Sequence, residues 1–105
     1  MKRGEIWLAR LGPREQGEAA KAYVCLIVSP PEIHDHLDVA IVAPMAAGSG
    51  AAAFRVEASV EGKSGRFLLE QLRTLDKAQL VRCVGSLDRK TLSAALRVLR
   101  EMFAE

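Results

Sequence analysis

Short apolar runs of strand length, separated by glycine and proline, occupy most of the chain up to residue 87. The clearest extends from Val24 to Val28, is rich in branched side chains, and is stopped by Ser29, Pro30 and Pro31. Branched residues favour strands, and proline cannot donate to the ladder of a sheet, so this run indicates a buried β-strand. A succession of such runs predicts a sheet that closes on itself or is covered by another layer.

Six strands are predicted in all. They are Gly4 to Leu11, Tyr23 to Ser29, Asp38 to Pro44, Phe54 to Ala58, residues 66–75 (RFLLEQLRTL) and residues 81–87 (VRCVGSL). We expect residues 66–75 to form one continuous strand after a turn at residues 61–65, with Glu70 and Leu72 on one face and Gln71 and Arg73 on the other. Residues 76–80 fit a single helical turn.

The last segment has the period of a helix. The apolar residues that recur at helical spacing are Leu92, Ala95, Leu96, Leu99, Met102 and Phe103. Asp88 precedes them as a candidate N-cap. Several strands followed by one late helix predict a mainly β (α+β) fold, a small antiparallel barrel or sheet with a C-terminal helix packed on it. At 105 residues the chain is expected to form a single domain over residues 1–105, with roughly 60–70% of its unfolded surface buried.

Charge and hydropathy limit the classes of partner, such as membranes or polyanions, that the protein is expected to bind. No stretch approaches the roughly 18 to 20 apolar residues of a membrane span, and the first residues lack the apolar core of a secretory signal. We therefore expect a cytoplasmic protein with no membrane partner. The net charge is +2, but residues 62–105 hold nine Lys and Arg against five Asp and Glu. This balance permits a polyanionic partner without requiring one.

Cysteine and histidine give little sign of metal or redox chemistry. Cys25 and Cys83 lie inside apolar runs without a further Cys or His at metal spacing, so we expect two buried free thiols and no metal or cofactor. His34 and His36 are two residues apart, but no third ligand accompanies them. A polar loop between strands is the plainer interpretation of the pair, and contact of this loop with a substrate is the alternative.

Three motifs occur in order over nearly the whole chain. They are G-E-I-W at residues 4–7, V-S-P at residues 28–30 and L-E-Q-L-R-T-L-D-K at residues 69–77. Together they resemble the PemK/MazF family of toxin endoribonucleases. The resemblance implies an SH3-like barrel with a C-terminal helix, a homodimer, and the toxic half of a toxin–antitoxin pair. It also implies metal-free cleavage of single-stranded RNA and binding of a cognate acidic antitoxin peptide.

The resemblance implies a particular chemistry. The 2′-hydroxyl of the RNA attacks the neighbouring phosphate, so the protein must manage two protons and stabilise an electron-rich phosphorane. The family uses an Arg in an R-P pair at the mouth of the second strand and a Thr just after the third. In this chain those positions hold Tyr23, followed by Val24, and Ala46. Glu18 matches an acidic position that the family has in the preceding loop.

The two substitutions leave more than one function open. Loss of an oxyanion donor typically costs about 10²–10³ in rate, so we expect impaired RNA cleavage. The alternative is a relative that binds RNA or antitoxin without cutting. A lower alternative is a poison of DNA gyrase, because another toxin family is similar in fold. Tyr23 itself is expected either to stack on a base or donate a proton, or to cover the rim of the barrel.

The remaining candidates are RNA-binding residues. Gln71 is expected to read a base edge and Arg73 to hold a phosphate, although Arg73 pairing with Glu70 or Asp76 is the structural alternative. Arg14 and Lys21 are expected as further cations, unless they are only solvated loop charges. His34 and His36 complete the set. We also expect an acidic, partly disordered antitoxin segment with apolar anchors to bind across this basic groove.

Overall fold

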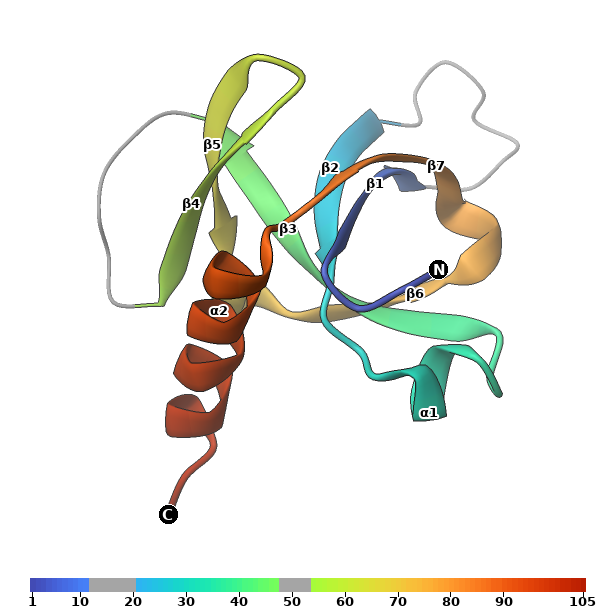
Figure 1. Ribbon diagram of the computed structural model, residues 1–105. Coiled ribbons are helices and arrows are strands. Elements are labelled where there is room, and N and C mark those ends of the chain that lie inside the picture. Colours follow the sequence, from blue (N-terminus) through green and yellow to red (C-terminus); the bar gives the residue numbers. More distant parts are fainter. Residues whose placement is uncertain (12–20, 48–53) are drawn as a thin grey trace.

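Seven strands, two α-helices and two single-turn 3-10 helices make up residues 1–11, 21–47 and 54–105, the part of the chain that the computed structural model describes (Figure 1). The strands are β1 (Glu5–Leu11), β2 (Lys21–Ile27), β3 (Val39–Ala47), β4 (Arg55–Val60), β5 (Lys63–Leu68), β6 (Arg73–Asp76) and β7 (Leu80–Ser86). The helices are α1 (Pro31–His34), η2 (Leu69–Gln71), η3 (Lys77–Gln79) and α2 (Arg89–Met102).

All of the strand pairings are antiparallel. The order is β4-β5-β3-β2-β1-β7, and β6 also pairs with β3. The nine residues of β3 pair with three different strands. Residues 39–42 pair with β6, residues 42–44 with β2, and residues 45–47 with β5. Figure 1 shows the sheet curling around this long strand. The mainly β architecture, an SH3-like antiparallel barrel with a C-terminal helix, is confirmed.

Each side of the sheet carries its own apolar core, because successive residues of a strand point to opposite faces. The helix-side core contains Ile6, Leu26, Val28, Ala43, Val60, Phe67, Leu69 and Ala95. The second core contains Ala9, Cys25, Ile27, Ala40, Val42, Leu75 and Leu80, with Trp7 and Tyr23 packed against it. The even-numbered residues of β2 therefore face α2, and its odd-numbered residues face the second core.

The β4–β5 hairpin is tighter than expected. Glu61 and Gly62 form its turn with φ values of 51° and 80°, and β5 begins at the next residue, Lys63. Two consecutive positive φ values are the pattern of a type I′ turn, whose twist matches that of the flanking strands. The expected five-residue turn over residues 61–65 is therefore wrong.

The expectation of one strand over residues 66–75 is also wrong. Phe67 pairs with Met45 of β3, and Arg73 pairs with Val42. Between these partners the chain has five residues, 68 to 72, whereas β3 has only two. The three extra residues form the single turn η2, in which Leu69 is fully buried. The alternation predicted for Glu70, Gln71, Leu72 and Arg73 therefore does not hold.

The predicted helical elements are present. Asp88 caps α2, since its carboxylate accepts a hydrogen bond of 2.7 Å from the backbone N–H of Thr91. Ala95 of α2 is buried in the helix-side core, but Phe103 after the helix is 73% exposed. The expected turn over residues 76–80 is η3, which a capping box between Asp76 and Gln79 stabilises.

The two cysteines are both free but differ in environment. Cys25 is fully buried in the second core. Cys83 lies on β7, an edge strand of the sheet in the described part of the chain, and is exposed. The expectation of a buried thiol is therefore confirmed for Cys25 and wrong for Cys83.

Candidate functional site

Tyr23 and Ala46, the two substituted positions, lie on the same face of the sheet. Across the β2–β3 ladder, Cys25 pairs with Pro44, and directly paired residues point to the same side. Tyr23 is two residues from Cys25, and Ala46 is two residues from Pro44, so both share the face of the second core. The strands therefore place residues 23 and 46 on one face of the sheet, each two residues beyond the Cys25–Pro44 pair.

Arg73 lies on this face as well. It pairs with Val42 of β3, which in turn pairs with Ile27 of β2. Arg73 is exposed, and its positive charge acts on the Tyr23 phenol in the direction that lowers the pKa. An Arg73 N–H approaches the Tyr23 hydroxyl closely enough to lower its pKa in the same direction, although the contact falls short of ordinary hydrogen-bond geometry.

The Tyr23 phenol is a neutral donor at physiological pH. Burial raises its pKa above the ordinary value of 10, and the neighbouring Cys25 raises it further, while Arg73 opposes both. The net direction is upward, so the hydroxyl keeps its proton at neutral pH. The buried, protonated phenol therefore cannot act as a general base.

The carboxylates expected to pair with Arg73 are engaged elsewhere. Glu70 accepts from Arg55 of β4 at 2.9 Å, and this contact holds the pKa of Glu70 below its usual range. The Asp76 side chain accepts from the backbone of η3. Neither forms an ion pair with Arg73, so the structural alternative for Arg73 is wrong. Gln71, at the end of η2, is exposed two residues before it.

Two residues beside Ala46 were missed from the sequence. Arg66 is its direct partner across the β3–β5 ladder and places a second guanidinium on the same face. Gly65 lets the two strands approach closely, because a Cβ at this position would lie 2.8 Å from the Ala46 carbonyl oxygen. Only the register of β5 against β3 reveals either role, and sequence periodicity does not contain that register.

A cleft of about 300 Å³ opens at the mouth of β2. Its walls come from three places: Ala22, Tyr23 and Val24 of β2, Met45 and Ala47 of β3, and Val60, Lys63 and Ser64 of the β4–β5 hairpin. Lys63 is exposed and was not among the expected residues. The cleft therefore lies beside Tyr23 and contains the Lys63 ammonium group, but Ala46 is not among the described residues that line it.

The two histidines of the α1 loop have different surroundings. His34 is 1% exposed, and its Nδ1 lies 2.9 Å from the buried Ser29 Oγ. Its Nε2 lies 3.7 Å from a carboxylate oxygen of Asp35. A buried ring cannot contact RNA at the surface, so the expectation is wrong for His34. His36 is exposed, and its RNA-binding role stays a prediction.

The predicted loop residues are beyond the described part of the chain. Arg14 and Glu18 fall within residues 12–20, and for Lys21 only the backbone, as the first residue of β2, is described. Their roles stay predictions. Within residues 1–11, 21–47 and 54–105, no group of three His, Cys, Asp or Glu side chains is placed to hold a metal ion.

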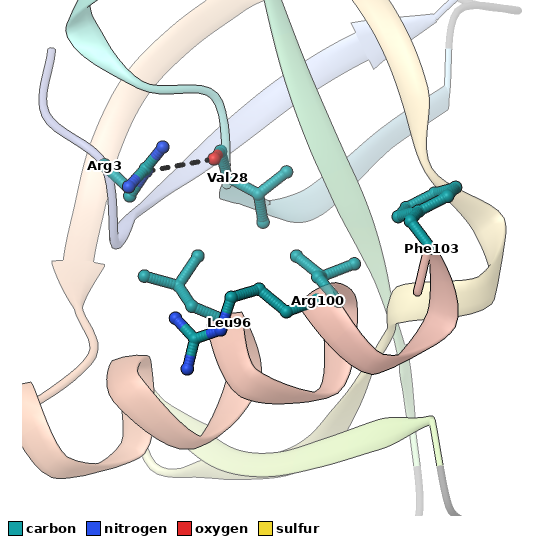
Figure 2. Close-up of a pocket in the computed structure, with 6 residues that line it drawn as sticks. Arg3, Val28, Leu96, Arg100 and Phe103 are labelled. Carbon is teal, nitrogen blue, oxygen red and sulfur yellow. Dashed lines mark hydrogen bonds between the residues drawn. The ribbon is translucent and has the colours of Figure 1, made fainter. Parts of the chain in front are cut away.

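A second and larger cleft, of about 640 Å³, lies between α2 and the start of the chain (Figure 2). It is lined by Arg3, Val28, Leu96, Leu99, Arg100 and Phe103. Arg3 is held by a hydrogen bond from its Nε to the Val28 carbonyl oxygen, 3.2 Å long. The apolar stripe of the terminal helix thus packs on the core with one edge and lines an open cleft, with two guanidinium groups, along the other.

Comparison with known sequences settles the family. Residues 2–103 match the PemK-like, MazF-like toxins of type II toxin–antitoxin systems. The chain belongs to this family. No curated protein matches it in sequence. None of the helices in the described part of this PemK/MazF-like chain is long and apolar enough to cross a membrane.

Solved structures show the same fold at low identity. The Mycobacterium tuberculosis toxin MazF-mt6 aligns with a TM-score of 0.77 and 20% identity, over 94% of this chain and 95% of that one. A mycobacterial endoribonuclease in complex with its cognate antitoxin gives 0.79 and 19%, over 96% and 92%. A MazE–MazF complex from Deinococcus radiodurans gives 0.79 and 17%, over 97% and 94%. The PemK/MazF fold is therefore shared over nearly the whole chain.

Proposed function

We propose that this chain is an RNA-directed toxin of a cytoplasmic toxin–antitoxin system, with impaired cleavage of single-stranded mRNA. The observation that carries the proposal is the shared face of residues 23 and 46 in a chain of the PemK/MazF family. The impairment follows from the side chains at these positions, because a phenol and a methyl group replace a guanidinium and a hydroxyl. A relative that binds RNA or antitoxin without cutting is the second candidate, and the same two residues favour it.

The reaction balances without a metal or redox partner. The 2′-oxygen of the RNA forms a bond to phosphorus, and the bond from phosphorus to the 5′-oxygen breaks. One proton leaves the 2′-hydroxyl and one arrives on the 5′-oxygen, so the products are a 2′,3′-cyclic phosphate and a 5′-hydroxyl end. The demand on the protein is to stabilise the extra negative charge of the phosphorane, for which cations and neutral donors are suited.

RNA binding at this face is tested with a double variant, Gln71→Ala with Arg73→Ala. Loss of a base contact and a phosphate contact is expected to weaken binding of a fluorescent single-stranded RNA by about tenfold or more. The matched control is Arg97→Ala with Ser93→Ala, which removes the same charge from the exposed surface of α2. Equal affinity of both variants would contradict an RNA surface here and would favour a protein target.

The antitoxin proposal involves the larger cleft as well as the RNA face. Leu96, Leu99 and Phe103 offer an apolar lining, and Arg3 and Arg100 add two positive charges. This combination suits an acidic segment with apolar anchors, the chemistry expected of the antitoxin. A homodimer is the expected assembly, and sedimentation of the chain at micromolar concentration tests it.

A further inference from the structure

Arg73 is placed to act on a phosphate that is bound beside position 23. Through the ladders of β6, β3 and β2, Arg73 shares the face of Ile27, and Tyr23 shares that face four residues earlier on the same strand. The Tyr23 hydroxyl is buried, whereas Arg73 is exposed. The Arg73 guanidinium also lies close enough to the Tyr23 hydroxyl for its charge and its N–H groups to lower the pKa of the phenol.

The charge of Arg73 is available to an anion. Glu70 is held by Arg55 on β4, and Asp76 is held by the backbone of η3. The nearest acidic groups on the second-core face, the Tyr23 phenol and the Cys25 thiol, both have raised pKa values and are neutral at physiological pH. Within the described residues Arg73 thus has no carboxylate partner, and an exposed guanidinium beside neutral groups is suited to binding a phosphate.

We propose that Arg73 is the catalytic cation of this chain, in place of the Arg that position 23 lacks, and that Tyr23 positions it. This inference rests on the proposed function and deepens it. The guanidinium would bind the non-bridging oxygens of the scissile phosphate and stabilise the phosphorane, without taking part in either proton transfer. The neutral Tyr23 side chain would support the guanidinium from below, as an aromatic surface and a hydroxyl acceptor.

Single-turnover cleavage of a fluorescent single-stranded RNA, with protein in saturating excess, tests this role. Arg73→Met is expected to lower the residual rate by about 10²-fold or more, and Arg73→Lys by less. The control Arg97→Met, on the exposed surface of α2, is expected to cut like the parent. Tyr23→Phe is expected to lower the rate without changing the affinity for a 2′-deoxy analogue of the RNA, which a merely structural role would not do.

The decisive comparison uses the Tyr23→Arg background. With a guanidinium restored on β2, Arg73→Met is expected to cost less than about tenfold, because one cation then replaces the other. Equal costs in the two backgrounds would overturn the inference, since Arg73 would then have an independent role. So would unchanged cleavage by Arg73→Met, or cleavage by the Tyr23→Arg chain alone.

Failure of the proposed function has a separate signature. In that case neither the parent nor the Tyr23→Arg chain would bind or cut the RNA, whatever stands at position 73. Circular dichroism and thermal unfolding of each variant ensure that a lost rate is compared only between folded proteins. Arg73 and Arg97 are both exposed, so their Met variants are expected to fold alike.

Discussion

The phenol of Tyr23 and the thiol of Cys25 are two residues apart on β2 and point to the same side of the sheet. Burial raises the pKa of Tyr23, and it raises that of Cys25 to about 12. Both groups are therefore uncharged at neutral pH, and neither compensates the positive charge of Arg73. The identities at positions 23 and 46 follow from motif order in the sequence. The meeting of Tyr23 with Arg73 does not, because it depends on β2 and β6, which are about 50 residues apart along the chain, both pairing with β3.

The two cysteines provide a prediction at this scale. The thiolate is the reactive form of a cysteine side chain. With a pKa of about 12, Cys25 has almost no thiolate at pH 8. Cys25 is also buried, whereas Cys83 is exposed to solvent. In the native protein, maleimide is expected to label one thiol per chain rapidly, and Cys83→Ser is expected to abolish this labelling until denaturant is added. The matched variant Cys25→Ser is expected to label like the parent. Rapid labelling of native Cys83→Ser would contradict the burial of Cys25.

At the scale of elements, β3 is the strand that assembles the site. It carries position 46, faces β2 with position 23, and pairs with both β5 and β6. Strands β1 to β4 and β7, the single turn of η3 and helix α2 were predictable because periodicity and capping residues are local signals. The break at η2 was not. Residues 66–75 contain no glycine or proline to mark a break, and the turn arises only because five residues must fit opposite two of β3.

Gly65 provides a prediction for the β3–β5 contact. An added methyl group would meet the Ala46 carbonyl oxygen at 2.8 Å and the Met45 side chain at 2.6 Å. Gly65→Ala is therefore expected to lower the free energy of unfolding by about 1–3 kcal/mol, measured by urea denaturation. Gly85→Ala on β7 is the control, because nothing lies within 4 Å of its added Cβ, and a change within about 0.5 kcal/mol is expected. Equal stability of the two variants would show that β5 does not approach Ala46 this closely.

The whole molecule presents two different surfaces on opposite sides of one sheet. The face of the second core carries Tyr23, Ala46 and Arg73, whereas the helix side carries the apolar cleft between Arg3 and Phe103. The composition of the chain predicted a polyanionic partner only as a possibility. The separation of a cationic face from an apolar cleft emerges when the register of the sheet and the packing of α2 are known. We therefore propose RNA as the partner of one face and a peptide as the partner of the other.

Peptide binding provides the prediction at this scale. An acidic peptide with apolar anchors is expected to bind more weakly at 0.5 M than at 0.05 M salt, because screening reduces its attraction to Arg3 and Arg100. Phe103→Ala is expected to weaken binding by about tenfold at both salt concentrations, through the loss of an aromatic anchor. Val81→Ala, which truncates an exposed apolar side chain outside the cleft lining without changing the charge, is the control. Affinity that neither salt nor Phe103→Ala changes would place the peptide elsewhere.

The measurement that tests the central claim most directly is cleavage of a long mixed-sequence RNA in EDTA. It compares the chain with a version restored at three positions, Tyr23→Arg, Val24→Pro and Ala46→Thr. If residues 23 and 46 form one phosphate site on this face, the restored protein is expected to cut at least about 10²-fold faster than the parent. If both proteins fold and the restored one cuts no faster than the parent, these positions do not carry the chemistry and the account is contradicted.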